Sequence, residues 1–587
     1  MGTTIQPRIK KIVDTREGLR NFEAEIGTAT AKEQNIFLQY PTVYIHNWED
    51  SQDFEVYVGE TNNILQRTKQ HYDTESDVGK WENQLSKHEA SMYVIAHDHF
   101  NKSLTLDVEN RLIHYISSID QVKKVYNNRD NPQNKYYPDD ELDDIFHMIW
   151  KKLHRDNKEL FPSESVIKSS AIFKASPFHK LTENQLKIKG VIIDRVFEAL
   201  KEDKNGQIIL IQGETGTGKT VLNSSTFYSI FESAEEQNMK LKCRMMVNHD
   251  EQITVYAQIA DKMGLTEKYG EVVCKPTHFI NSVSTDEPVD VAFVDEAHLL
   301  LTRGKQSYRG QNQLKDILER ARVTVVMFDE NQILTAEQYW ESELLDRYKN
   351  LAISQNNYFE LKDQLRMSAS QETIDWINSI TFDRIIHKIP VDKTGYDIKI
   401  FDSPEEMERA IKDKAANEDT HLSRLIATYD WKYIAQKRPT NHLNRYWEVI
   451  INAWHKPWNR ELNYNLDNKT KRANKKLAWA EQPQTIDEVG STFTIQGFDL
   501  NYAGVILGPS VTYEDGKIKW APEKSYSAKA TQKRKLSDGQ SKSFGDKLLQ
   551  HEVRVLMTRG VNGLYIYACN EKLREALKRA AARQEKK

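Results

Sequence analysis

The sequence contains few cysteines, no long apolar run and little net charge. Its three cysteines, Cys243, Cys274 and Cys569, lie far apart and form no CxxC pair, which argues against a disulfide framework or a zinc site. No apolar run approaches the ~18 residues that a membrane span needs. The N-terminal MGTTIQPRIK also has no apolar signal-peptide core. These absences predict a cytoplasmic protein that does not contact a membrane.

The net charge of −4 gives the chain no overall attraction to nucleic acid, so any basic binding surface must be local. Apolar residues make up 39% and charged residues 29% of the sequence, which is typical of an ordinary globular protein. At roughly 100–200 residues per domain, a chain of 587 residues predicts three or four compact units.

The first part of the chain has the pattern of a small α+β domain. PTVYIHN (41–47), DFEVYVG (53–59) and SMYVIAHDH (91–99) predict strands. Residues 62–73 and 106–119 show helical spacing. A stretch rich in asparagine, proline and acids (127–140) marks a boundary. We therefore predict an N-terminal extension at 1–39, a domain at 40–135 and a helical linker at 136–176.

From residue 177 onward the pattern is that of a parallel sheet. QIILIQ, VDVAFVDEA, VTVVMFD, LIATYD and YAGVILG predict strands buried on both faces, and helical segments separate them. The predicted fold class is therefore α/β. We expect one lobe at 177–350 and a second at 351–587, the latter with a basic insertion at 515–547.

A phosphate-binding loop follows the first of these strands. GETGTGKT matches GxxxxGK[ST] and comprises Gly213, Glu214, Thr215, Gly216, Thr217, Gly218, Lys219 and Thr220. Backbone N–H groups at the start of the next helix would surround the phosphates, Lys219 would reach the β/γ-phosphates, and Thr220 would ligate Mg²⁺. A chance glycine-rich turn is disfavoured because strand, loop and helix occur in the required order.

The strand VDVAFVDEAH ends in two carboxylates that suit ATP hydrolysis. Asp295 would hold Mg²⁺ through its water shell, and Glu296 would orient the attacking water. His298 completes the letters DEAH, with packing and coupling both open as its role. The cofactors predicted by these two motifs are ATP and Mg²⁺.

Cationic groups from the second lobe are needed to neutralise charge in the transition state. Arg366 in LKDQLRMSAS is one candidate, and Arg554 and Arg559 in HEVRVLMTRGVNG are two more. Gln332 follows the strand VVMFD and resembles the helicase glutamine that senses the γ-phosphate.

These motifs together resemble a bacterial P-loop family related to the Schlafen-type DNA/RNA helicase domain. The resemblance rests on LTENQLKI, the two nucleotide motifs, RLIATYDW, EVGSTFTIQGFDLNYAGVILGPS and RVLMTRGVNGLYIY, and it covers about residues 177–575. It implies two RecA-like lobes of the superfamily 1 kind and ATP hydrolysis. It also implies a motif coupling nucleic acid to nucleotide at Thr494, Gln496 and Gly497, and a base-reading role for Gln185.

A second set of residues lies in the N-terminal domain. Tyr44 and Tyr57 fall on adjacent predicted strands, and Arg67 and His71 share a helical face by their i,i+4 spacing. Glu109 lies in the later helix, and Asn127 or Asn128 follows it. A one-metal nuclease needs such a carboxylate for the metal, a group to activate water and a cation for the phosphate.

This order resembles the GIY-YIG nuclease family over about residues 40–130. VYI replaces the first triplet and YVG the second, while both tyrosines and Gly59 are kept. The resemblance implies that Tyr44, assisted by Tyr57, activates water, and that Arg67 binds the phosphate. It further implies that Glu109 holds Mg²⁺ and that His71 positions or donates a proton. Since a tyrosine has an ordinary pKa near 10, its role needs nearby positive charge.

Two further features could contact nucleic acid. The basic insertion carries Lys529, Lys533, Arg534 and Lys535, which predict either phosphate contacts or a solvated loop. The tryptophans of the second lobe, Trp454, Trp458 and Trp479, are predicted to pack in its core, with stacking on bases as the alternative.

The sequence favours an ATP-dependent, helicase-like nuclease that cleaves phosphodiester bonds with Mg²⁺, in defence against foreign DNA. DNA is the favoured partner and RNA stays open, as do a homo-oligomer and a partner protein. One alternative is an ATP-gated nucleic-acid sensor with a regulated or silent nuclease module. Another is a repair or RNA-processing helicase.

Overall fold

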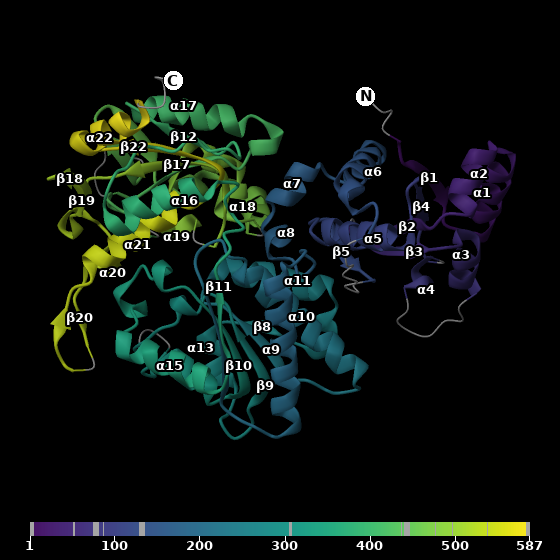
Figure 1. The fold of residues 1–587 in the computed structure, drawn as a ribbon, viewed down its shortest axis with the longest axis horizontal. Coiled ribbons are helices and arrows are strands. Elements are labelled where there is room, and N and C mark those ends of the chain that lie inside the picture. Colours follow the sequence, from purple (N-terminus) through teal and green to yellow (C-terminus); the bar gives the residue numbers. More distant parts are fainter. Residues whose placement is uncertain are drawn as a thin grey trace. The chain divides into compact units, whose positions relative to one another are not determined.

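The computed structural model describes residues 5–582 except 51–52, 74–80, 86, 128–135, 305–307, 436, 440–445, 476, 496 and 537. The chain divides into two compact units (Figure 1). The first unit comprises Met1–Leu181 and Tyr256–Val272, and the second comprises Thr182–Val255 and Val273–Lys587. Each unit is described by itself below.

The first unit is built on a five-stranded sheet with the order β1-β4-β2-β3-β5. Its strands are β1 (Arg8–Val13), β2 (Thr42–Asp50), β3 (Asp53–Thr61), β4 (Ala90–Ala96) and β5 (Val122–Val125). Neighbours pair antiparallel, except that β5 runs parallel to β3. The three strand predictions for this part of the chain are therefore confirmed.

Helices cover both faces of this sheet. They are α1 (Arg16–Thr28), α2 (Ala31–Leu38), α3 (Ile64–Asp73), α4 (Glu82–Leu85), α5 (Lys102–Ser117), α6 (Leu142–Asp156), α7 (Glu164–Ser169) and α8 (Ala171–Ala175). Because side chains alternate along a strand, Val43 and Ile45 pack with α5 and α6, while Tyr44 between them packs with α1, α2 and α3. The alternation thus places Tyr44 on the face that carries α3.

Two predicted boundaries in this unit are wrong. Residues 1–39, predicted as an extension, supply α1, α2 and the edge strand β1, which pairs with β4. Residues 136–176, predicted as a linker, supply α6, whose Phe146, Ile149 and Trp150 are buried in the same apolar cluster as α5. The edge strand was missed because RIKKIV alternates weakly and leaves most of its side chains partly exposed.

The first lobe of the second unit contains a six-stranded parallel sheet with the order β11-β6-β10-β9-β7-β8. Its strands are β6 (Gln207–Gly213), β7 (Cys243–Met246), β8 (Val273–Cys274), β9 (Val289–Val294), β10 (Ala321–Phe328) and β11 (Tyr358–Leu361). The helices along this part of the chain are α9 (Glu183–Lys201), α10 (Lys219–Glu236), α11 (Asp250–Lys262), α12 (Leu265–Tyr269), α13 (Pro276–Ser282), α14 (Gln313–Leu318) and α15 (Ser342–Ser354). The end of α11 and all of α12 fall in the first unit, where Lys262 Nζ donates to the carbonyl oxygens of Ser117 and Ile119.

The second lobe contains a five-stranded parallel sheet with the order β12-β22-β17-β13-β16. Its strands are β12 (Asp397–Ile400), β13 (Arg424–Ala427), β16 (Val489–Gly490), β17 (Leu500–Leu507) and β22 (Gly560–Ala568). Its helices are α16 (Gln371–Asn378), α17 (Pro404–Ala415), α18 (Asn468–Asn474), α19 (Thr492–Ile495), α20 (Ala528–Thr531), α21 (Gly545–Met557) and α22 (Glu571–Ala582). The predicted parallel α/β class is confirmed for both lobes.

The three tryptophans of the second lobe belong to the protein interior. Trp454 is 5% exposed, and Trp458 and Trp479 are fully buried. Their prediction as core residues is confirmed, and the stacking alternative is wrong. Among the described residues, no helix is both long and apolar enough to cross a membrane.

Residues 528–544 of the basic insertion, which we call the arm, extend from the second lobe to the first (Figure 1). The arm contains α20 and the hairpin β20 (Arg534–Lys535) and β21 (Ser541–Lys542). Arg534 is buried and donates from Nη1 to Thr302 Oγ1 and to the carbonyl oxygen of Ala336, each at 2.8 Å. The ring of Phe544 stacks on Tyr339 at 3.8 Å.

This docking corrects one sequence prediction. Arg534 was expected either to contact phosphate or to lie in a solvated loop, but its guanidinium is buried against the first lobe. Lys529, Lys533 and Lys535 are exposed, and both alternatives stay open for them. The difference arises because adjacent residues in the hairpin point to opposite faces, one toward the first lobe and one toward solvent.

Arg534→Ala is expected to undock the arm. The substitution removes two hydrogen bonds from a charged donor, each typically worth about 1.5–3 kcal/mol, so local opening of residues 528–544 should become at least about 100-fold more frequent. Amide hydrogen exchange of this segment measures the change. Lys535→Ala, on the exposed face of the same strand, is the matched control, and equal exchange in both variants would contradict the docking account.

Glu552 on α21 should make the free energy of unfolding of the second unit depend on pH. Burial and the carboxylate of Asp430 raise the pKa of Glu552 to about 8, whereas an unfolded glutamate titrates near 4.3. Between these two pH values, Glu552 is protonated in the folded chain and ionised in the unfolded chain. The free energy of unfolding is therefore highest at acid pH and falls as the pH rises toward 8. Glu552 Oε1 accepts from the Tyr429 N–H at 2.8 Å, and a glutamine can keep that bond.

Glu552→Gln is therefore expected to stabilise the second unit by roughly 2–4 kcal/mol at pH 8 and to change little at pH 5. Thermal unfolding at both pH values measures this. Glu523→Gln, at an exposed position, serves as the control. Destabilisation by Glu552→Gln at pH 8 would show that the charged carboxylate is needed.

Candidate functional site

The loop between β6 and α10 has the backbone geometry of a phosphate cradle. Gly216 and Gly218 adopt φ values of +88° and +78°, which side chains rarely tolerate. A Cβ on Gly216 would also lie 1.9 Å from Gln364 Oε1, and one on Gly218 would lie 2.4 Å from Gln185 Nε2. The positive φ values therefore favour glycine at both positions, and α10, whose first turn has unsatisfied backbone N–H groups like that of any α-helix, begins directly after this loop.

Lys219 is folded back onto its own loop. Its Nζ donates to the carbonyl oxygens of Gly213 and Glu214 at 2.7 and 2.8 Å, and it lies 3.4 Å from Asp329 Oδ2. Thr220, the next residue, is half-buried in the first turn of α10. The ammonium group is thus stored beside the position that phosphates would occupy.

The end of β9 carries the two predicted carboxylates. Asp295 is 1% exposed, and its Oδ1 accepts from the Glu296 N–H at 3.0 Å. Glu296 has a left-handed backbone (φ +47°), an uncommon conformation for a residue other than glycine. Burial acts to raise the pKa of Glu296, but His298 and Lys219 outweigh it and lower that pKa. Glu296 therefore stays a carboxylate, as a group that orients water must.

The second lobe reaches this site through Arg559. Its Nη2 donates to Gln332 Oε1 at 3.1 Å, and Gln332 Nε2 donates to Asp329 Oδ2 at 2.9 Å. Since Asp329 also contacts Lys219, a continuous polar chain joins the two lobes. Burial, followed by the nearby charge of Arg366, lowers the pKa of Arg559 to about 9, so this guanidinium is poised for an anion.

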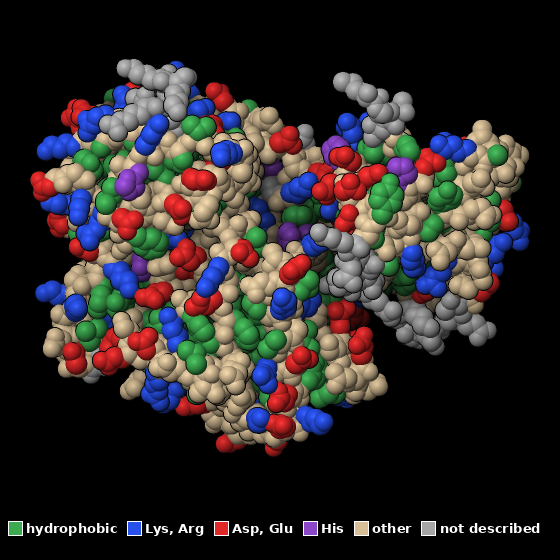
Figure 2. Space-filling view, viewed as in Figure 1, with side chains coloured by type: hydrophobic (Ala, Val, Ile, Leu, Met, Phe, Trp, Pro, Cys, Tyr) green, Lys and Arg blue, Asp and Glu red, His purple; other side chains and the backbone are tan. Residues whose placement is uncertain are grey.

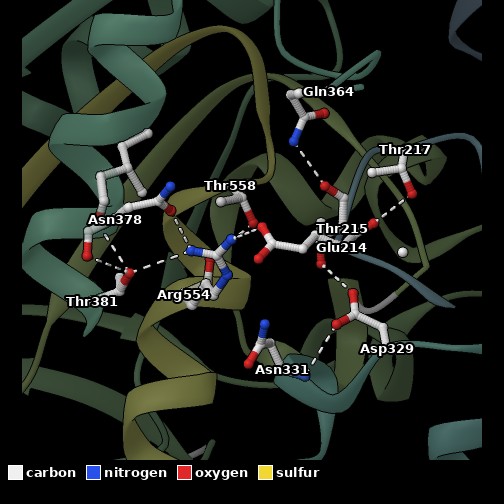
Figure 3. Close-up of polar contacts among 12 residues, drawn as sticks. Glu214, Thr215, Thr217, Asp329, Asn331, Gln364, Asn378, Thr381, Arg554 and Thr558 are labelled. Carbon is white, nitrogen blue, oxygen red and sulfur yellow. Dashed lines mark hydrogen bonds and ion pairs between the residues drawn. The ribbon is translucent and has the colours of Figure 1, made fainter. Parts of the chain in front are cut away.

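Arg554 makes a second connection across the lobes (Figure 3). Its Nη2 pairs with the carboxylate of Glu214, and its Nη1 hydrogen-bonds Asn378 Oδ1 and Thr381 Oγ1. Figure 3 also shows Gln364 donating to the carbonyl oxygen of Thr215 at 2.7 Å. The guanidinium thus lies directly against the phosphate loop.

The remaining predicted residues lie at the edges of the site. Arg366 forms an ion pair from Nε to Asp499 Oδ1 at 2.6 Å, and Gln185 Nε2 donates to the carbonyl oxygen of Thr217 at 3.2 Å. Gly497 has φ +87°, and a Cβ there would lie 2.6 Å from Gln252 Nε2. Thr494 Oγ1 accepts from the Ser491 N–H at 2.8 Å. Gln496 lies outside the described residues.

In the first unit, the two predicted tyrosines lie together. Their rings are stacked with centroids 6.2 Å apart. Tyr44 is paired across the strands with Gly59, where a Cβ would lie 2.5 Å from the Tyr44 hydroxyl. The glycine of the YVG triplet therefore makes room for the phenol of Tyr44.

The hydroxyl of Tyr44 contacts both residues predicted on α3. Arg67 Nε donates to it at 3.3 Å, and His71 Nε2 lies 3.1 Å from it. Burial, and then Tyr57, raise the pKa of Tyr44, and Arg67 does not outweigh them. The positive charge expected to lower this pKa is present but insufficient, so ionisation of Tyr44 needs a proton acceptor or further positive charge.

Glu109 on α5 is buried beside Asn127. Asn127 Nδ2 donates to Glu109 Oε1 at 2.9 Å and to the carbonyl oxygen of Val58 at 2.8 Å. Burial, and then Glu60, raise the pKa of Glu109 to about 7. Asn128, the alternative to Asn127, lies outside the described residues. A cation would therefore find here a carboxylate whose charge is otherwise poorly compensated.

The family that matches this chain covers most of the second unit. Residues 206–570, well over half of the chain, match the family described as Schlafen group 3, DNA/RNA helicase domain. The chain belongs to this Schlafen-type helicase family. The second unit is therefore a P-loop NTPase of the helicase kind, and the matched residues contain most of the contacts described above between the two lobes.

Individual relatives of this Schlafen-type chain are distant. A Saccharomyces cerevisiae protein named YPL245W is 31% identical over 462 residues, covering 73% of this chain and 96% of the yeast protein, so relatives are not confined to bacteria. A Pif1 helicase structure has 11% identity and a TM-score of 0.28, covering 68% of this chain and 94% of that one. A DEAD box protein from Methanococcus jannaschii has 12% identity and a TM-score of 0.26, covering 72% and 96%. These two TM-scores are too low to support an inference.

ATP with Mg²⁺ is the usual cofactor of such helicase domains, and the Schlafen-type site fits it. The loop glycines leave room that a Cβ would fill, Lys219 is stored within reach, and Asp295 and Thr220 offer oxygen ligands of the kind Mg²⁺ takes. In the first unit, fewer side chains are available to hold Mg²⁺. The described residues contain no group of three or more His, Cys, Asp or Glu side chains placed to hold a metal, but Mg²⁺ often uses one or two carboxylates with waters and phosphate.

Several residues of the site are not marked by any motif. Gln364 and Asn378 hold the loop and Arg554, and Asp499 pairs with Arg366. Asp499 follows the coupling motif directly, which could have indicated it. Gln364 and Asn378 carry no such signal, because amides in loops and at helix ends are common.

Lysines, arginines and acidic residues are interspersed over the lobes on the face shown in Figure 2. This distribution agrees with the small net charge of −4. Electrostatic attraction to a phosphate backbone must therefore come from local groups.

Proposed function

We propose that the second unit hydrolyses ATP while bound to nucleic acid and that the first unit cleaves phosphodiester bonds with Mg²⁺. The observation that carries the first part is the polar chain from Arg559 through Gln332 and Asp329 to Lys219. It joins the two lobes at the phosphate loop. Binding of a triphosphate would replace protein partners of these cations and so change how the lobes contact each other.

The residues have distinct roles in this proposal. Lys219 moves from the loop carbonyls to the phosphates, and Arg366, Arg554 and Arg559 exchange their present partners for developing negative charge. Glu296 orients the attacking water. Mg²⁺ supplies charge neutralisation when it is bound, with Thr220 and Asp295 as its proposed holders.

The proposed nuclease site rests on the contacts of the Tyr44 hydroxyl with Arg67 and His71 and on the buried Glu109. Tyr44 would remove a proton from water, Arg67 would hold the scissile phosphate, and Glu109 would hold Mg²⁺. Tyr57 stacks beside Tyr44 and keeps its ring in place. Joining a nuclease domain to a helicase-type unit raises the effective concentration of the nuclease at the bound strand. This arrangement suits defence against foreign DNA.

The arm favours a second candidate function. Arg534 and Phe544 of the second lobe contact the first lobe. Because these contacts limit movement between the lobes, they suit an ATP-gated nucleic-acid sensor that changes state without translocating. ATP turnover measured with single-stranded DNA, single-stranded RNA and a forked duplex separates the candidates. Stimulation with strand displacement supports the motor. Stimulation without displacement supports the sensor, and no ATP turnover with any nucleic acid contradicts both.

A further inference from the structure

The imidazole of His71 lies between a phenol and a carboxylate. Its Nε2 is 3.1 Å from the Tyr44 hydroxyl, and its Nδ1 is 3.3 Å from Glu82 Oε1. Burial, followed by the charge of His46 and Arg67, lowers the pKa of His71 to about 3. At neutral pH the ring is therefore uncharged and carries a single N–H, on one nitrogen or the other.

The two partners decide which nitrogen carries the proton. A carboxylate oxygen accepts hydrogen bonds, so the contact with Glu82 favours the tautomer with the N–H on Nδ1. Nε2 then presents a lone pair to Tyr44, whose O–H can donate to it. The Tyr44 oxygen accepts in turn from Arg67 Nε at 3.3 Å. The three contacts form one directed chain from carboxylate to imidazole to phenol.

Glu82 is held in this position by its surroundings. It begins the short helix α4, directly after Trp81, whose ring stacks on Tyr57 at 4.2 Å. The side chain of Glu82 is 15% exposed, and its Oε2 is buried without a hydrogen-bond partner among the described residues. A buried, unsatisfied carboxylate oxygen is costly.

We infer that Glu82 is a positioning residue that holds His71 in the tautomer whose Nε2 receives the proton of Tyr44. The inference rests on the proposed nuclease function. Its logic is that of other sites in which a carboxylate fixes the tautomer of a histidine base and stabilises the imidazolium that forms. No sequence motif marks Glu82.

Tyr44 takes a proton from water and passes its own proton to Nε2 of His71 in one step, as the water oxygen bonds to phosphorus and the bond to the leaving oxygen breaks. The imidazolium then lies beside Glu82, and the phenol oxygen keeps its contact with Arg67. The leaving oxygen takes a proton from solvent, and His71 returns one to solvent.

Glu82→Gln tests the inference, because glutamine keeps the shape and an accepting oxygen but removes the charge. The expected result is a 10- to 100-fold lower single-turnover rate of cleavage of labelled DNA, with unchanged affinity for that DNA. A merely structural acceptor would be replaced by glutamine without such a loss. Glu89→Gln, at an exposed position a few residues away, is the matched control. Equal rates in both variants would overturn the inference.

A second measurement does not depend on cleavage. Nitrogen NMR of the full chain labelled with ¹⁵N-histidine, with the His71 signals assigned from a His71→Asn sample, reports which ring nitrogen is protonated. The expected tautomer is Nδ1–H in the wild type, with a mixture in Glu82→Gln. An Nε2–H tautomer in a wild-type chain that cleaves would overturn the role of Glu82 alone. A wild-type chain that cleaves neither DNA nor RNA would overturn the proposed nuclease and the catalytic part of this inference.

Discussion

Lys219→Ala is expected to lower ATP turnover at least about 1000-fold, which corresponds to about 4 kcal/mol of transition-state stabilisation. Lys219 is the cation closest to the phosphate loop, and it already lies within 2.8 Å of two of the loop's carbonyl oxygens. Arg554 and Arg559 extend from the second lobe and contact Glu214 and Gln332, so neither takes the place of Lys219 within the loop. Steady-state phosphate release with saturating nucleic acid measures the loss.

The control for this variant is Lys240→Ala, an exposed position a few residues beyond α10, which should turn over ATP like the wild type. Folding of Lys219→Ala is checked by its thermal unfolding. Among the described residues, the Lys219 ammonium contacts two carbonyl oxygens and one carboxylate of its own lobe, at 2.7–3.4 Å, so the substitution leaves the packing of the lobe largely in place. A folded Lys219→Ala chain that retains more than about one tenth of wild-type turnover would contradict the assignment of this loop as the ATP site.

Glu109→Gln is expected to abolish cleavage of DNA while leaving ATP turnover unchanged. A neutral amide is a far weaker ligand for Mg²⁺ than a carboxylate, and a loss of about 1000-fold or more is expected for a site that offers so few other protein ligands. The amide oxygen of glutamine can still accept from Asn127, which now donates at 2.9 Å. The substitution therefore removes charge without opening a cavity.

The same substitution should also stabilise the first unit at alkaline pH. The pKa of Glu109 is raised to about 7, so the folded chain binds a proton more tightly than the unfolded chain does, and stability falls as the pH rises from about 4 toward 7. Because glutamine does not ionise, Glu109→Gln removes this pH-dependent fall in stability. A variant that is inactive yet at least as stable at pH 8 excludes misfolding as the cause, whereas cleavage at the wild-type rate would contradict the role of Glu109.

The nucleotide site was predictable because its geometry is local. Gly216, Gly218 and Lys219 occur in one short loop between a strand and a helix, and the strand QIILIQ and its neighbours are buried on both faces, as their composition indicates. The parallel sheets followed from the same pattern. What could not be predicted was the set of partners that each cation has in the folded chain, such as Asp499 for Arg366.

In the first unit, the sequence predicted the contacts that follow from local structure but not those that depend on the tertiary fold. Tyr44, Arg67 and His71 were expected together, and their side chains do meet, because alternation in β2 and the i,i+4 spacing in α3 fix their directions. Glu82 lies on a separate short helix, and only the tertiary structure brings it to His71. Strand β1 and the docking of Arg534 were missed for the same reason, since both depend on contacts distant in sequence.

We propose that two separable active sites share this chain, and one set of assays tests this proposal most directly. ATP turnover and cleavage of labelled linear and circular DNA are measured with Mg²⁺, with and without ATP, for the wild type, Lys219→Ala and Glu109→Gln. We predict that Glu109→Gln hydrolyses ATP but does not cleave, and that Lys219→Ala does not hydrolyse ATP and cleaves less or at fewer positions. Cleavage that is indifferent to Glu109→Gln would contradict the account.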